Sequence, residues 1–184
     1  MGYYRVLKDR EVADLCFFGE PRDVSGEIDA RRFTRCERYG EPPKPLQIPI
    51  VEPGNKPDFA FGAFDLPVVS PRLGRRLQDL APDAVELIPA IADDAEREIL
   101  NVLRCVDCID EARTVGEKWP VGSPRKDRVG QYRTIVHLFL DSSRLVGHHV
   151  FRVRGWEVAL VISDDVAQQL PKAQMYGTRL IPVT

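Results

Sequence analysis

The sequence predicts an α+β fold, with a mainly antiparallel sheet, two helices of moderate length and long proline-rich loops. Short apolar runs rich in β-branched and aromatic residues recur along the chain and are separated by turn residues. Only two segments combine a helix N-cap with apolar residues at helical spacing. The chain also has 15 prolines, and the six that lie between positions 42 and 57 disfavour regular structure there.

Composition indicates one globular domain spanning residues 1–184. Hydrophobic residues make up 43% and charged residues 29% of the chain, which is ordinary for a domain with its own core. The formal net charge of −2 provides no overall basic field for nucleic acid or anionic lipid. No run of 18 apolar residues is present, and charges near the N-terminus argue against a signal peptide. We therefore expect a cytoplasmic protein with reduced cysteines and with no nucleic-acid or membrane partner.

In the N-terminal part, aromatic and β-branched residues predict a strand at 3–7. The spacing of Phe33 and Cys36 predicts a short helix within 28–39. The following prolines predict an irregular connection with a short edge strand at 46–51. The alternation of large and small residues at 58–64 leaves two possibilities open, a strand or a tight aromatic turn.

Both helices are predicted from their caps. Ser70 as N-cap and Pro71 at the first helical position start the first helix, and Pro82 ends it. Ser163 caps the second helix, which Pro171 shortens or kinks. The apolar faces of the two helices comprise Leu73, Leu77, Leu80, Val166 and Leu170.

The C-terminal half reads as a series of strands around a charged loop at 111–129. Proline interrupts the first of these strands, and the second is the long run that ends in an acidic pair. The expected strands are 85–91, 97–109, 132–140, 149–153, 158–162 and 178–183.

The long run contains a Cys-x-x-Cys pair, Cys105 and Cys108. A structural zinc site needs four ligands, and thioredoxin-type chemistry needs the pair at a helix start. On a strand, the two side chains point to opposite faces. We therefore expect no metal, no disulfide between these two residues, and cysteines that act as small buried apolar groups.

An enzyme remains the alternative interpretation. Asp107 or Cys108 could act with His137 in a hydrolase or transferase. No glycine-rich nucleophile turn accompanies them. Asp107 interrupts an apolar run, so we expect it to be buried and paired with Arg104 or Arg133. The residues favour this structural role, with no catalytic residues, metal ligands or cofactor.

Three basic groups could contact phosphate, which would make the chain a nucleic-acid-linked regulator. Carboxylates elsewhere in the chain offset their charge, so a solvated surface is the simpler interpretation. The groups are Arg72, Arg75 and Arg76; Arg125, Lys126 and Arg128; and Arg152 and Arg154 with Trp156.

Several short motifs occur in one order along nearly the whole chain. They are Gly19-Glu20-Pro21-Arg22, Pro67-Val68-Val69-Ser70, Ile99-Leu100-Asn101-Val102 with Val106-Asp107-Cys108-Ile109-Asp110, Phe151-Arg152 before Gly155, Leu160-Val161-Ile162-Ser163, and Gly177-Thr178-Arg179. With these motifs the chain resembles immunity protein family eleven of bacterial polymorphic toxin systems.

The resemblance implies a protein that neutralises a cognate toxin, encoded beside it, by binding rather than by catalysis. It transfers no catalytic residues. Binding hot spots favour Trp, Tyr and Arg, and such residues gather in two predicted loop regions. Trp119 is the best candidate for exposure, whereas core packing is an equal alternative for Trp156. The predicted partner-binding residues are Trp119, Arg125, Arg128, Arg152, Arg154 and Trp156.

Overall fold

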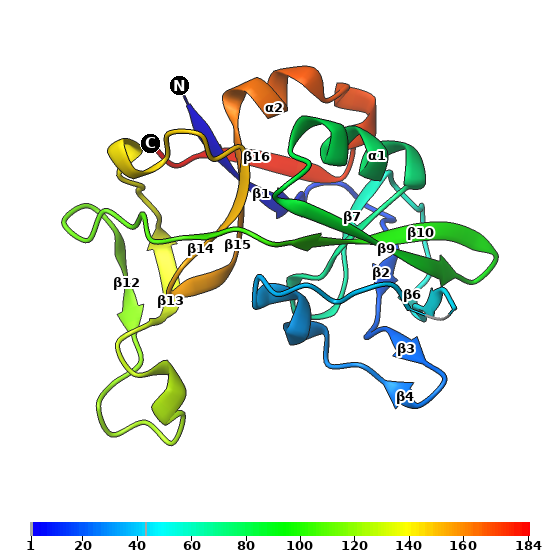
Figure 1. Cartoon of the computed structure of the whole chain (residues 1–184), viewed down its shortest axis with the longest axis horizontal. Helices are drawn as coiled ribbons and strands as arrows, with labels where there is room; N and C mark the ends of the chain where they lie inside the picture. Colours follow the sequence, from blue (N-terminus) through cyan, green and yellow to red (C-terminus); the bar gives the residue numbers. More distant parts are fainter. Residues whose placement is uncertain (1, 43) are drawn as a thin grey trace.

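The computed structural model describes residues 2–42 and 44–184 and contains two main sheets (Figure 1). The five-stranded sheet has the order β11-β14-β15-β1-β16. Only the β11–β14 pair in it is parallel. Its strands are β1 (Tyr3–Lys8), β11 (Cys105–Val106), β14 (Val150–Val153), β15 (Trp156–Ser163) and β16 (Thr178–Pro182).

The seven-stranded sheet has the order β4-β3-β5-β9-β10-β8-β7 and is built around the β9–β10 hairpin. Two small two-stranded sheets complete the strand structure, β2 with β6 and β12 with β13. The predicted α+β class with mainly antiparallel sheet is confirmed. The strands are β2 (Phe17–Phe18), β3 (Arg22–Asp23), β4 (Gly26–Glu27), β5 (Leu46–Gln47), β6 (Ile50–Glu52), β7 (Phe59–Phe61), β8 (Pro67–Val69), β9 (Val85–Ala92), β10 (Ala95–Val102), β12 (Val115–Lys118) and β13 (Tyr132–His137).

The two predicted helices form where their caps place them, α1 at Pro71–Leu80 and α2 at Asp164–Gln169. The hydroxyl oxygen of Ser70 accepts a hydrogen bond from the Leu73 N–H, and that of Ser163 accepts one from the Val166 N–H. These bonds satisfy free N–H groups of the first turn. Both helices lie on the same side of the molecule, above the sheets in Figure 1.

The two main sheets and both helices share one apolar cluster. Because strands of either sheet face the same helices, their apolar side chains are removed from water together. Its members include Val6, Phe61, Leu73, Leu100, Leu160 and Val166. No helix in the described part of the chain is both long and apolar enough to cross a membrane.

The predicted continuous strand at 97–109 is wrong. β10 ends at Val102, and after Leu103 and Arg104 the chain leaves the seven-stranded sheet and enters the five-stranded sheet as β11. There Cys105 lies opposite Arg152 of β14 in a parallel pair. An apolar run predicts a strand but not the sheet in which the strand pairs. The composition of this run therefore did not reveal that the chain changes from one sheet to the other.

Other boundaries also differ from the prediction. The edge strand expected at 46–51 is divided between β5 and β6, which pair in different sheets. β9 is continuous through Pro89, and its outer neighbour β5 is in register with Ala90 and Ile91 of β9 but not with Pro89. A proline is tolerated in a strand where its missing N–H is not needed for a hydrogen bond to the neighbouring strand.

The segment at 58–64 contains both alternatives, a strand (β7) and then a 3-10 turn, η2 (Ala63–Asp65). The loop expected at 111–129 contains β12 and the 3-10 turn η3 (Lys126–Arg128).

The helix predicted within 28–39 is reduced to a 3-10 turn, η1 (Ala30–Thr34). Cys36 has φ 60°, which breaks the helical path. The Glu86 carboxylate of β9 then accepts hydrogen bonds from the N–H groups of Tyr39 (2.8 Å) and Gly40 (3.1 Å). Buried Asn101 donates to the same carboxylate at 2.7 Å and to the Glu37 carbonyl at 2.8 Å. Backbone groups of residues 37–40 thus form hydrogen bonds with Glu86 and Asn101 of the sheet instead of the backbone hydrogen bonds of a helix.

This carboxylate predicts a pH-dependent contribution to stability. Burial raises the pKa of Glu86, but the donors from Tyr39, Asn101 and Gly40 outweigh it and leave the pKa below its usual value. The stabilising contribution is therefore present above the pKa of the unfolded chain and is lost as pH falls through the folded-state pKa. We expect Glu86→Gln to lower the free energy of unfolding by ~1–3 kcal/mol at neutral pH, because part of the donor set loses its acceptor.

Urea unfolding at pH 7 and pH 3 measures this effect. The difference between wild type and Glu86→Gln should shrink at the acidic pH. Glu96→Gln is the matched control, since Glu96 lies exposed on the adjacent strand β10. A difference of equal size at both pH values would contradict the role given to the Glu86 charge.

Candidate partner-binding groove

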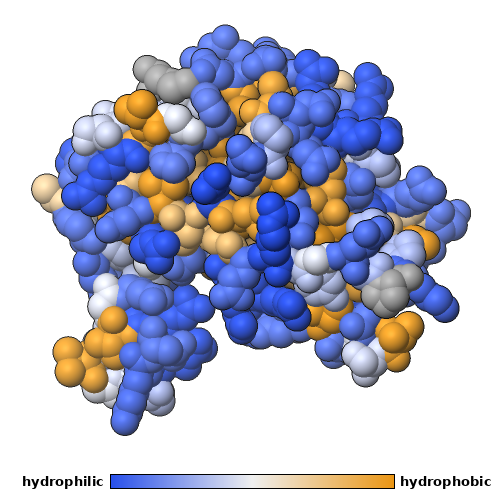
Figure 2. Space-filling model, in the orientation of Figure 1, coloured by the Kyte–Doolittle hydropathy of each residue, from blue (hydrophilic) through white to orange (hydrophobic). Residues whose placement is uncertain are grey.

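Four of the six predicted partner-binding residues line one pocket of about 250 Å³. The pocket lies between the β12–β13 hairpin and the turns η1 and η2, where Figure 2 shows a notch between the protruding hairpin loop and the rest of the molecule. We call this pocket the arginine groove. It is lined by Arg31, Thr34, Phe64, Asp65, Trp119, Arg125, Arg128, Tyr132, Arg133, Trp156, Glu157 and Val158.

A second pocket of about 320 Å³ adjoins the arginine groove, because Thr34, Arg128 and Glu157 line both. Arg154, a fifth predicted residue, lies in this second pocket together with Cys36. We call it the thiol pocket. The tertiary structure therefore brings the two predicted loop regions to one continuous concavity.

The hairpin wall of the arginine groove is held by backbone pairing. The Trp119 N–H donates to the Gln131 carbonyl at 2.9 Å, and the Gly130 N–H donates to the Trp119 carbonyl at 3.1 Å. The Arg133 guanidinium lies over the Trp119 ring, 5.4 Å from its centroid. Trp119 is half-buried, so its ring is fixed on one side and available on the other.

The opposite wall contains residues that sequence reasoning did not select. Phe64 and Asp65 both have left-handed backbone conformations, with φ 54° and 56°. Such strain costs on the order of 1–3 kcal/mol per residue and concentrates at functional sites. Phe64 is 43% exposed, and the Arg31 guanidinium stacks on its ring at 3.5 Å. The only signal in the sequence was the alternation that left an aromatic turn open at 58–64.

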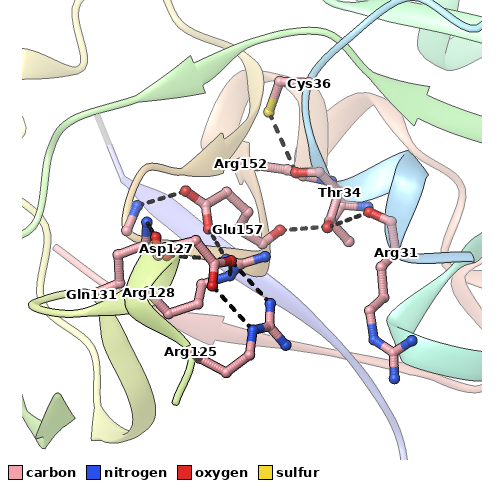
Figure 3. Close-up of polar contacts among 10 residues, drawn as sticks. Arg31, Thr34, Cys36, Arg125, Asp127, Arg128, Gln131, Arg152 and Glu157 are labelled. Carbon is pink, nitrogen blue, oxygen red and sulfur yellow. Dashed lines mark hydrogen bonds and ion pairs between the residues drawn. The ribbon is translucent and has the colours of Figure 1, made fainter. Parts of the chain in front are cut away.

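Ion pairs orient the arginines of the groove (Figure 3). Arg128 donates to Glu157 at 3.3 Å and to the Gln131 amide oxygen at 3.0 Å. Arg125 pairs with Asp127 at 3.1 Å. The lining residues include four arginines and two carboxylates, Asp65 and Glu157. Two more carboxylates lie beside the lining: Asp29 pairs with Arg31, and Asp127 pairs with Arg125 and Arg128.

Two predicted residues lie deeper than expected. The surface position predicted for Arg152 is wrong: its side chain is completely buried and donates to the Glu157 carbonyl at 2.8 Å. Burial lowers the pKa of Arg152 to about 10. Trp156 is 8% exposed, and the Arg5 guanidinium lies 4.2 Å from its ring centroid. Trp156 therefore packs in the core, which was the alternative interpretation of this residue. The small exposed part of Trp156 lines the groove.

The model of the immunity protein family (Imm11) matches residues 20–184. The chain belongs to this family. It is therefore a toxin-neutralising immunity protein of a polymorphic toxin system, as the ordered motifs implied. Such proteins are typically non-catalytic, and their function is to bind a cognate toxin. No curated protein matches the chain.

Asp107, Cys108 and His137, the residues of the alternative enzyme interpretation, do not form a catalytic arrangement in the structure. The buried position predicted for Asp107 is wrong: its side chain is 74% exposed and lies 3.9 Å from Arg144, not beside Arg104 or Arg133. Cys108 is completely buried, its thiol donates to the Val106 carbonyl, and burial raises its pKa to about 12. His137 lies exposed at the end of β13. A protonated thiol without access to solvent is not an activated nucleophile.

Proposed function

We propose that this Imm11 protein neutralises its toxin in the cytoplasm by binding it through the arginine groove, with residues 1–184 acting as one domain. One observation carries the choice of surface. Five of the six residues predicted from hot-spot residue types, which come from separate parts of the sequence, line two adjoining pockets. The shared apolar cluster of both main sheets supports the single domain.

The groove combines features that favour tight binding of a protein partner. Trp119 and Phe64 offer aromatic surface whose orientation is already restricted by stacked arginines. Restricting side chains before binding reduces the entropy lost in the complex. Arg125 and Arg128 are likewise held by acidic neighbours. These pairs leave the arginine N–H groups that face solvent available for carboxylates of the toxin.

The shape of the protein suggests how inhibition follows from binding. The hairpin loop between β12 and β13 protrudes from the body (Figures 1 and 2). A toxin segment held in the groove would contact this loop on one side and η1 and η2 on the other. We propose that the bulk of the immunity protein then covers the active site or the substrate path of the toxin. Nucleic acid and membranes are not partners in this proposal, since the formal net charge is −2.

Co-expression with the toxin encoded by the adjacent gene tests the function. We expect restored growth and a stoichiometric complex that survives size-exclusion chromatography. Toxicity that persists while both proteins accumulate would contradict the proposal.

A double variant, Asp107→Asn with His137→Ala, separates binding from catalysis. Both residues are exposed and lie outside the groove, so the variant should protect as well as wild type. Loss of protection by a variant that still folds would favour the enzyme alternative instead.

A further inference from the structure

Two cysteines far apart in the sequence meet in the thiol pocket. Cys36 follows the turn η1, whereas Cys105 begins β11, and the fold brings both to the lining of this one pocket. Both residues are half-buried and line the pocket of about 320 Å³, so a small molecule can reach them. In Figure 3 the Cys36 side chain is drawn with its contact to the Thr34 carbonyl, beside Arg152. Both cysteines are free thiols.

A buried cation lies beneath this pair. Arg152 faces Cys105 across the β11–β14 pair, and its Nε and Nη2 atoms have no hydrogen-bond partner among the described residues. The Arg152 charge favours the thiolate form of both cysteines. The two thiols are nevertheless unequal. The neighbouring Cys36 lowers the pKa of Cys105, whereas the neighbouring Cys105, together with burial, raises the pKa of Cys36.

We propose that Cys36 and Cys105 form a redox-active thiol pair that low-molecular-weight disulfides oxidise to an intrachain disulfide. The Cys105 thiolate attacks one sulfur of the small disulfide, forms a mixed disulfide and releases one small thiolate. Cys36 then gives up its proton to that thiolate and attacks the Cys105 sulfur, which expels the second small thiolate. Two cysteine thiols are thereby oxidised by two electrons, and one small disulfide is reduced to two thiols.

The cross-link would connect η1 to β11 at the border of the arginine groove. Thr34, two residues before Cys36, lines both pockets, so the new bond would limit movement of the η1 wall. Cys108 takes no part, because its thiol is completely buried and hydrogen-bonded within the core. This site is independent of the toxin-binding proposal, since its chemistry is measured on the isolated protein.

Oxidised glutathione is the probe for the full-length chain. We expect the number of titratable thiols in the subsequently denatured protein to fall from the four in the sequence to half that number. Non-reducing peptide mapping should show Cys36 linked to Cys105, and dithiothreitol should reverse the linkage. Cys36 and Cys105 that both stay reduced, or a Cys105–Cys108 link, would overturn the proposal.

Single variants test the order of the two steps. Cys36→Ser should stop at a stable glutathione adduct on Cys105, whereas Cys105→Ser should leave Cys36 unmodified. Cys108→Ala is the control and should still form the cross-link. Should a variant fail to fold, the pH profile of alkylation by iodoacetamide in wild type decides instead. Cys105 must react at lower pH than Cys36, and equal or reversed profiles would contradict the assigned roles.

Discussion

Truncating Trp119 to alanine is expected to weaken toxin binding at least about 30-fold, the equivalent of ~2 kcal/mol. Trp119 offers a half-buried ring in the arginine groove, backed by Arg133 on one side. A toxin side chain packed on that ring would lose its contact surface. Arg125→Glu should weaken binding to a similar degree, because it replaces a donor to toxin carboxylates with a repelling charge. Calorimetric titration of the purified toxin measures both effects.

The matched control is Arg72→Glu, which makes the same charge change on the exposed face of α1, away from the groove. It should bind like wild type. Arg125 is exposed, so Arg125→Glu should change the free energy of unfolding by less than ~1 kcal/mol. Groove variants with wild-type affinity, together with an α1 variant that no longer binds, would place the toxin-binding surface on the helix instead.

Removing the Phe33 side chain is expected to lower the free energy of unfolding by ~3–5 kcal/mol in Phe33→Ala. Phe33 is only 1% exposed and belongs to the apolar cluster beneath η1. Its ring centroid lies 5.4 Å from that of Tyr39, so it also holds the segment that follows η1. The cavity left by alanine would loosen the wall that carries Arg31 and Thr34. Urea unfolding measures the loss.

Phe64→Ala is the matched control for this effect. It deletes the same atoms from a side chain that is 43% exposed, so the loss of stability should be much smaller. Phe33→Leu should fall between wild type and Phe33→Ala, because leucine fills part of the space. Equal losses in Phe33→Ala and Phe64→Ala would show that η1 is not anchored by its buried ring.

Local features of the sequence determined much of the fold. Ser70 with Pro71 and Ser163 with the following aspartates specify the starts of α1 and α2, since capping bonds span only three residues. The strand at 3–7 was also predictable, because aromatic and β-branched residues favour extended structure wherever the strand pairs. The ordered motifs were sufficient to indicate the immunity family, and the hot-spot residue types pointed to Trp119, Arg125, Arg128 and Arg154.

Only the tertiary structure decided which residues meet. The change of sheet after Val102 moves Cys105 out of the predicted strand and into the pocket that Cys36 also lines, and no local pattern encodes a meeting across that separation. The fold also buries Arg152, which was expected at the partner-binding surface, and exposes Asp107, which was expected to be buried because it interrupts an apolar run. Propensity and periodicity act over a few residues, whereas burial depends on which distant strands pack on each side. For this protein, the residue types proposed for binding were therefore readable in the sequence, and the pockets that bring them together were not.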